Sequence, residues 1–251
     1  MYPSRITHVL GLLGLSFLLL VAVFLVYYGL LENNIEHAGA FEAFLVVSIP
    51  FSMVHAYAWW HNRKCDFDHL TASRAYWPLL ALLLVVLLLV EVAEVLRMNF
   101  NTLNPYARGS WSDLLPMVVM GPVFEEWIFR DIYLKGLLAS GHYKKWVAVA
   151  FVSALFAIAH FDVTQGLAWN NMLHVLYTLL VGVGLSVLYM KFGSLVLNAL
   201  FHMTLNGLGV TLSLWFSSCE PVSWSVAGGF VLFGLTIPVM YFVLKRLWFL
   251  S

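Results

Sequence analysis

The sequence predicts an all-α polytopic membrane protein with about eight transmembrane helices and both termini in the cytosol. Hydrophobic residues make up 62% of the 251 residues and charged residues only 10%, whereas soluble domains have about 25% charged residues. Apolar runs of about 20 residues, which span a bilayer as a helix, recur along the chain. Basic residues gather on one set of loops, as the positive-inside rule requires. We expect a single transmembrane domain over residues 1–251.

Each predicted span is bounded by polar or interfacial residues. The first begins after Arg5, and we expect it to be an uncleaved span because it is long and lacks an Ala-x-Ala cleavage pattern. The second ends in Trp59-Trp60-His61, and the eighth ends on Lys245-Arg246. In chain order the spans cover roughly 7–31, 40–60, 77–97, 112–139, 145–162, 171–190, 194–216 and 225–247.

The basic residues set the orientation, because they remain on the cytoplasmic side. Of the basic residues, only Arg97 and Arg108 flank the outer ends of the spans. Cys65 and Cys219 then fall on opposite sides of the bilayer and are not expected to form a disulfide. A net charge of zero argues against nucleic acid as a partner. The residues that flank the inner ends are Arg5, Arg63, Lys64, Arg74, Lys135, Lys144, Lys145, Lys191, Lys245 and Arg246.

The fourth span carries the stretch GPVFEEWIFR at residues 121–130. Ionisable groups at membrane depth cost about 2.5 kcal/mol or more each on insertion scales, so they need partners or a cavity. Glu126 and Arg130 share a helix face and are expected to form a buried ion pair. Glu125 is rotated by about 100° from Glu126, so it faces a cation, a neighbouring helix or water. Gly121-Pro122 predicts a helix break, whose new N-terminus would offer a positive dipole end to the carboxylates.

Three further polar residues lie in other spans at a similar depth. With a rise of 1.5 Å per residue, Glu125 and His160 lie about 24 and 22 Å from the nearest cytosolic loop. His202 and Asn206 lie about 16 and 22 Å from it, on one face of the seventh span that Asn198 extends by a turn. We expect the side chains of Glu125, His160, His202 and Asn206 to converge on one wet pocket that opens to the cytosolic leaflet.

A carboxylate, two histidines and an asparagine form a set that can hydrolyse a peptide bond. Glu125 with His160 would hold and deprotonate a water. His202 and Asn206 would donate hydrogen bonds to the oxyanion of a tetrahedral intermediate. Alternatively, Glu125, His160 and His202 would bind zinc or another divalent metal with one open position. The chain contains no His-Glu-x-x-His motif, and the spacing leaves both options open.

Other polar groups are predicted to have interfacial or packing roles. They are Glu91, Glu94 and Arg97 near the outer end of the third span; Asn170, Asn171 and His174 at the outer start of the sixth; and His55, His61 and His69, which flank the second cytoplasmic loop. Gly182 and Gly184 predict a close approach between helices.

Three motifs resemble those of the CPBP (CAAX protease and bacteriocin-processing, Abi) intramembrane endopeptidases. In chain order they are E-E-x-x-x-R at residues 125–130, F-x-x-x-H at 156–160 and H-x-x-x-N at 202–206. They occur in the order of the family and on three separate spans, within a motif-bearing core of about residues 112–216.

The resemblance implies a type II CAAX prenyl endopeptidase-like fold and cleavage of a membrane-associated peptide or membrane-anchored protein. By motif position, it gives Glu125, His160, His202 and Asn206 the catalytic roles described above, and the ion pair a supporting role. The family has been described both as metalloproteases and as glutamic-type peptidases. With an asparagine in the third motif we favour the metal-free type, and therefore no cofactor. We expect a bacterial inner (plasma) membrane protein that contacts lipid.

Two other functions remain open from the sequence. One is a non-catalytic membrane factor such as a bacteriocin-immunity protein, which would not require the four polar residues for protection. The other is a small transporter or proton relay, for which internal repeats would be typical, and the sequence shows none.

Overall fold

The computed structural model describes residues 3–31, 40–67, 78, 81–83, 85–89, 92, 115–217 and 242. These described residues form helices and no strand, which confirms the all-α class. By backbone contacts the chain divides into two compact units. The first comprises Met1–Asp68 and Gly109–Ala148, and the second comprises His69–Arg108 and Val149–Ser251. The single transmembrane domain expected for residues 1–251 stays a prediction.

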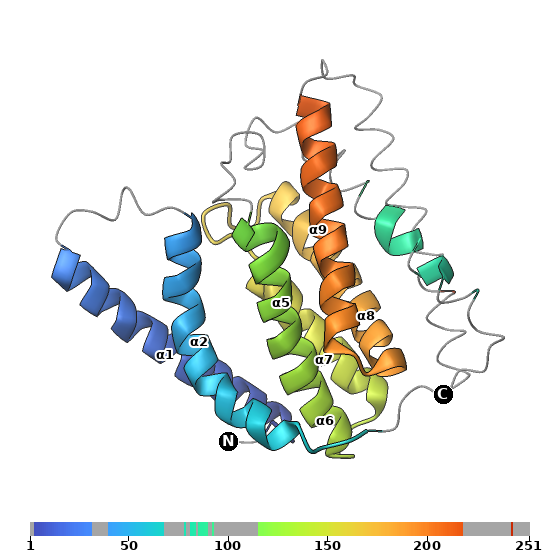
Figure 1. Cartoon of the computed structure of the whole chain (residues 1–251), viewed down its shortest axis with the longest axis horizontal. Coiled ribbons are helices and arrows are strands. Elements are labelled where there is room, and N and C mark those ends of the chain that lie inside the picture. The colour runs from blue at the N-terminus through green and yellow to red at the C-terminus, as the bar shows by residue number, and fades with distance from the viewer. Residues whose placement is uncertain are drawn as a thin grey trace. The chain divides into compact units, whose positions relative to one another are not determined.

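The first unit is built from two long helices and one helical stretch of mixed type. Helix α1 packs against α2 (Figure 1), and α2 also packs against the stretch that carries the first motif. That stretch is one continuous helix, in which α-helical turns alternate with π-helical turns. The elements are α1 (Ile6–Leu31), α2 (Ala40–Asn62), η4 (Pro116–Met120), α5 (Gly121–Glu126), η5 (Trp127–Leu134) and α6 (Lys135–Ala139), where η denotes a π-helix.

The helix break predicted at Gly121-Pro122 is wrong. Gly121 has helical dihedral angles, φ −56° and ψ −58°, and the helix continues through Pro122. In an α-helix the proline ring would clash with the carbonyl four residues earlier. Here the preceding turn is wider, and the Gly121 N–H donates to the carbonyl of Pro116. The π-helical turn therefore accommodates the proline without a break, and α5 offers no free N-terminus to the carboxylates.

The second unit contains most of α7 (Lys145–Ala159), together with α8 (Trp169–Phe192) and α9 (Leu195–Ser217). Helix α8 ends at Gly193, whose φ of 60° is the left-handed conformation that a glycine C-cap adopts readily. Asn198 of α9 then donates to the Leu185 carbonyl of α8 at 2.9 Å. This buried hydrogen bond ties the two helices together close to the turn that joins them.

The close helix approach predicted at Gly182 and Gly184 is confirmed. A Cβ atom at residue 182 would lie 3.1 Å from the Phe156 ring of α7. At residue 184 it would lie 2.6 Å from a methyl carbon of Leu87. Small residues at such positions let helices approach closely, which is how helices pack inside membranes.

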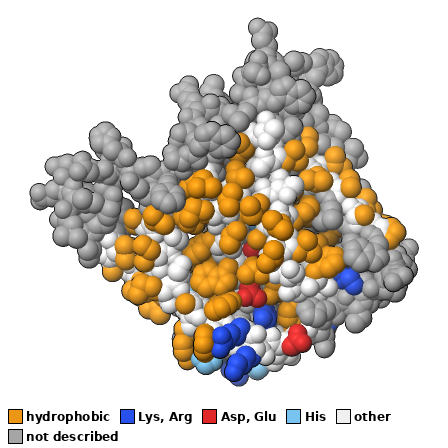
Figure 2. All heavy atoms as spheres, in the orientation of Figure 1, with side chains coloured by type: hydrophobic (Ala, Val, Ile, Leu, Met, Phe, Trp, Pro, Cys, Tyr) orange, Lys and Arg blue, Asp and Glu red, His pale blue; other side chains and the backbone are white. Residues whose placement is uncertain are grey.

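Two described helices are long and apolar enough to cross a membrane, judged by length and composition. They contain the windows Ile6–Val23 and Asn171–Phe192, with mean hydropathies of 2.4 and 1.9. Lys145–Ala159 and Leu195–Thr211 are shorter apolar helices. Hydrophobic side chains cover most of the described surface on the face in Figure 2. The count of eight spans stays a prediction.

Several predictions fall on residues outside the described ranges. The eighth span except residue 242 and about half of the third belong here, as do the ion cluster Glu91, Glu94 and Arg97, the histidine His69, and Cys219.

Candidate active site

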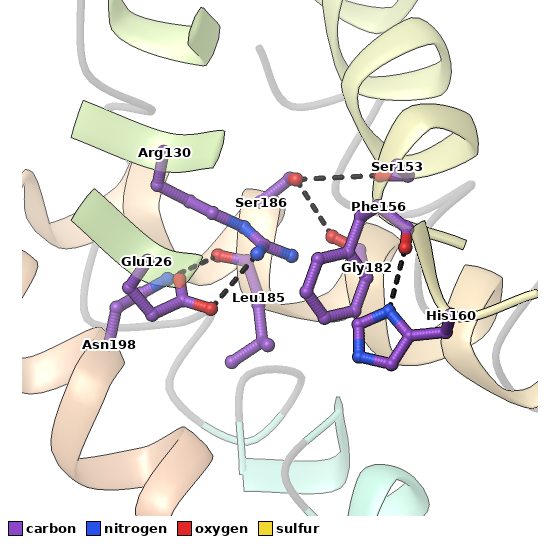
Figure 3. A network of polar contacts seen from close by, with 9 residues as sticks. All are labelled: Glu126, Arg130, Ser153, Phe156, His160, Gly182, Leu185, Ser186 and Asn198. Carbon is purple, nitrogen blue, oxygen red and sulfur yellow. Dashed lines mark hydrogen bonds and ion pairs between the residues drawn. The ribbon is translucent and has the colours of Figure 1, made fainter. Parts of the chain in front are cut away.

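The first motif contains the ion pair that the sequence predicts. Arg130 Nη1 donates to Glu126 Oε1 at 2.9 Å, and both side chains are fully buried. Figure 3 shows this pair extending between consecutive turns of its helix. A buried charge is strongly destabilising once its partner is removed. Replacing either residue alone should therefore destabilise the fold. The predicted supporting ion pair is confirmed as a contact.

Glu125 lies beside this pair and is half-buried. Its carboxylate is close enough to interact electrostatically with the Arg130 guanidinium. A Cβ atom at residue 121 would lie 3.7 Å from Glu125 Oε1, so the carboxylate extends back along the helix over Gly121. The absence of a side chain at Gly121 therefore leaves room for the Glu125 carboxylate.

The second motif lies at the end of α7. His160 follows the last helical residue, and its Nδ1 lies 2.8 Å from the carbonyl oxygen of Phe156 (Figure 3). A carbonyl oxygen can only accept, so Nδ1 carries the proton and Nε2 of the neutral ring carries the lone pair. The Phe156 ring, 1% exposed, lies 4.6 Å from the His160 ring between centroids. The motif therefore fixes both the position and the tautomer of His160.

The third motif meets the second at Phe156. His202 of α9 is 4% exposed, and its ring lies 5.9 Å from the Phe156 ring at an angle of 66°. Asn206 follows four residues later on the same helix face and is half-buried. Asn198, one turn earlier, is committed to the Leu185 carbonyl. Within the second unit the structure thus brings His160 and His202 together around one phenylalanine.

The four predicted catalytic residues are divided between the two units. Glu125 belongs to the first unit, whereas His160, His202 and Asn206 belong to the second. The single wet pocket expected from their common depth therefore stays a prediction.

His174 lies beside His160, and the sequence did not predict this contact. Its ring contacts the His160 ring edge-on, with 6.2 Å between centroids, and stacks on Tyr177 at 5.9 Å. The sequence placed His174 at the start of the sixth span, which α8 confirms. The contact itself depends on how the loop after His160 turns back, and no local pattern reveals it.

That loop is held to α8 by one buried side chain. Asn171 donates to the carbonyls of Asp162 at 2.8 Å and Gly166 at 2.7 Å, and it accepts from the Asp162 N–H at 3.1 Å. Hydrogen bonds from the hydroxyl and N–H of Thr164, followed by one from Gln165, lower the pKa of the Asp162 carboxyl. The turn after the second motif is therefore ordered by its own polar side chains.

His55 has the packing role that the sequence predicts. Helix α2 continues to Asn62, so His55 lies two turns inside the helix and is fully buried, deeper than a position beside the second cytoplasmic loop implies. It hydrogen-bonds to the hydroxyl of Tyr133 in η5. His61, by contrast, is exposed at the end of α2, as expected.

Over the described ranges, no group of three or more His, Cys, Asp or Glu side chains is arranged to hold a metal ion. The alternative ligand set of Glu125, His160 and His202 draws on both units, and it stays a prediction.

Comparison with known proteins assigns the motif-bearing region to a family. The family model "Type II CAAX prenyl endopeptidase Rce1-like" matches residues 107–208. An uncharacterized 24.3 kDa protein of Escherichia coli is 31% identical over 97 residues, which cover 39% of this chain and 42% of that protein. The match thus spans less than half the length of this curated relative. No solved structure matches.

All three motifs lie inside the matched residues. Rce1-like proteins are integral membrane proteases, and the apolar helices of this chain fit that class. Residues 107–208 therefore match the Rce1-like model of type II CAAX prenyl endopeptidases, and they are called the Rce1-like region below.

Proposed function

We propose that this protein is an intramembrane endopeptidase that hydrolyses a peptide bond in a membrane-associated peptide or protein. The observation that carries the proposal is the presence of all three motifs, in order, inside the Rce1-like region. The geometry within each unit supports it, because the first motif holds a neutralised ion pair and the second and third motifs meet at Phe156.

The reaction begins with a water held between Glu125 and His160. His160 Nδ1 is committed to the Phe156 carbonyl, so Nε2 is the nitrogen that accepts a hydrogen bond from the water. The Glu125 carboxylate takes a proton from the water as the water oxygen bonds to the scissile carbonyl carbon. General base catalysis of this kind contributes about 10²- to 10⁴-fold.

The carbonyl oxygen then carries a negative charge, which His202 and Asn206 stabilise by donating hydrogen bonds. A single oxyanion donor contributes about 10²- to 10³-fold in rate. When the carbon–nitrogen bond breaks, the proton held by Glu125 passes to the leaving amine. Glu126 and Arg130 support the site by maintaining the helix turn on which Glu125 lies.

The substrate and the topology complete the proposal. The family description, a CAAX prenyl endopeptidase, supports a prenylated peptide as one candidate substrate. We propose that the chain crosses a bacterial inner membrane eight times, with both termini in the cytosol and its helices in contact with lipid. Water activation without a metal is the favoured chemistry. If a divalent metal is used instead, Glu125, His160 and His202 would hold it, and it would supply a Lewis acid that lowers the pKa of the water.

The test uses the purified full chain in liposomes with quenched fluorescent peptides. One peptide ends in a farnesylated CAAX sequence, and the other is a leader-type peptide joined to a membrane anchor. Replacing the base in Glu125→Gln, or removing the imidazole in His160→Ala, should lower cleavage about 10²-fold or more. His202→Ala should lower it by a similar factor. Wild-type cleavage should persist in the presence of a chelator.

The control is His61→Ala, which removes an exposed histidine at the end of α2 and should leave cleavage unchanged. A folded Glu125→Gln variant with wild-type cleavage would refute the proposal. A non-catalytic immunity factor predicts a different result, namely that protection of cells survives when Glu125 and His202 are both replaced.

A further inference from the structure

A buried polar cluster on the inner face of α2 contacts the helix that carries the first motif. His55 and Asn62 are seven residues apart, so they share one face of α2, and both are fully buried. Asn62 Nδ2 donates to the carbonyls of Asp131 at 3.2 Å and Ile132 at 2.6 Å. His55 hydrogen-bonds to the hydroxyl of Tyr133. Three consecutive residues of η5 are therefore held from one face of α2.

The directions of the hydrogen bonds around His55 follow from its partners. Nδ1 lies 2.7 Å from the carbonyl oxygen of Phe51, which can only accept, so Nδ1 carries the proton. Nε2 is then the acceptor, and the Tyr133 hydroxyl donates to it. Ser16 of α1 donates its hydroxyl to the Leu12 carbonyl and lies 3.4 Å from His55 Nδ1. The imidazole is thus fixed in one tautomer with its acceptor directed at Tyr133.

These contacts matter because η5 has an unusual backbone. π-Helices are rare, mostly single turns, and frequent at functional sites, yet here the geometry extends over Trp127–Leu134. A slip of one residue in helical register rotates the following side chains by about 100°. A slip between Glu125 and residues 131–133 would therefore turn Glu125 by this angle relative to α2. External hydrogen bonds to residues 131–133 oppose this slip.

Aromatic contacts hold the same helix just before the two glutamates in the chain. The Phe124 ring, which directly precedes Glu125, meets the rings of Phe44 and Phe51 edge-on, with centroids 6.0 and 6.5 Å apart. Helix α2 therefore contacts the motif helix both before Glu125 and after Arg130.

We propose that His55 and Asn62 are positioning residues for the first motif. They hold residues 127–134 in π-helical register, which fixes the direction in which Glu125 points relative to α2. The effect on catalysis rests on the proposed function, whereas the effect on the helix does not.

The first measurement is hydrogen–deuterium exchange of the full chain in detergent. Tyr133→Phe removes only the donating hydroxyl, and His55→Leu removes the acceptor. Each should raise amide exchange in residues 127–134 about fivefold, the effect of losing one net hydrogen bond. Exchange in α9 should not change. Tyr57→Phe, on the exposed face of α2, is the matched control and should have no effect.

The second measurement is turnover of the farnesylated peptide by the same variants. Tyr133→Phe should lower kcat about fivefold with KM unchanged, because the hydroxyl positions the motif without touching substrate. His55→Gln, which retains a hydrogen-bond acceptor for Tyr133, should recover most of the kcat lost in His55→Leu. A role limited to stability would lower the yield of folded protein and leave the kcat of the folded fraction unchanged.

Unchanged exchange in residues 127–134 of both variants would overturn the inference, as would an unchanged kcat for folded Tyr133→Phe. If His55→Leu does not fold, Tyr133→Phe alone decides between these results. If the wild-type protein cleaves no peptide, the proposed function fails, while the exchange data still decide whether α2 holds the helix register.

Discussion

At the scale of single residues, one pattern occurs twice with different outcomes. Phe51 and His55 repeat the F-x-x-x-H spacing of Phe156 and His160. In both, histidine Nδ1 donates to the carbonyl of the phenylalanine, at 2.7 and 2.8 Å. His55, however, is fully buried with its Nε2 bonded to Tyr133, whereas His160 is only half-buried. In both cases the backbone carbonyl four residues earlier holds Nδ1, and the surroundings determine what the second nitrogen can do.

Phe156 gives a prediction at this scale. Phe156→Ala would remove a buried ring that contacts both motif histidines, and such a cavity costs about 3–5 kcal/mol. Phe156→Leu refills much of the space and should cost less. The thermal unfolding midpoint of the purified protein should fall in the order wild type, Leu, Ala. Wild-type stability of the Ala variant would contradict the packing role of the ring.

At the scale of elements, the helix of the first motif is shaped by contacts that its composition does not reveal. Gly121 approaches the Pro116 carbonyl across a π-helical turn, and a Cβ atom there would lie only 2.9 Å from that oxygen. Pro122 then fits without a break. The result is one continuous helix whose register is set by a glycine, a proline and the hydrogen bonds from α2.

Gly121→Ala tests this arrangement. Helix propensity alone favours alanine over glycine by about 1 kcal/mol, so a loss of stability would show that the contact with Pro116 outweighs propensity. We expect a lower thermal midpoint and reduced peptide cleavage, because the Glu125 carboxylate also lies against residue 121. Gly14→Ala in α1, where a Cβ would meet nothing within 4 Å, is the control and should be neutral or stabilising.

At the scale of the whole molecule, the Rce1-like region draws on both contact units. Residues 109–148 of the matched segment belong to the first unit, and residues 149–208 belong to the second. The proposed reaction needs Glu125 from one and the two histidines from the other. Peptide cleavage should therefore require both units of the folded chain. It should also require the chain to take its proposed orientation in the membrane.

The orientation can be measured with single cysteines in a background without Cys65 and Cys219. His142→Cys tests the loop between α6 and α7, and Thr164→Cys tests the loop between α7 and α8; both positions are exposed. A maleimide that cannot cross the membrane should label the Thr164→Cys variant in intact cells and leave the His142→Cys variant unlabelled until the cells are opened. Labelling of both in intact cells, or the reverse pattern, would contradict the proposed topology.

The sequence by itself determined the helical class and the ion pair. These features depend on spacing within one helix, which the helical repeat fixes wherever the helix lies. Tertiary structure alone decided that His55 is buried against Tyr133, that His174 lies beside His160, and that Gly121-Pro122 does not break the helix. Each of these depends on atoms supplied by another turn or another helix. Packing between helices selects such partners, and no periodicity in the sequence encodes them.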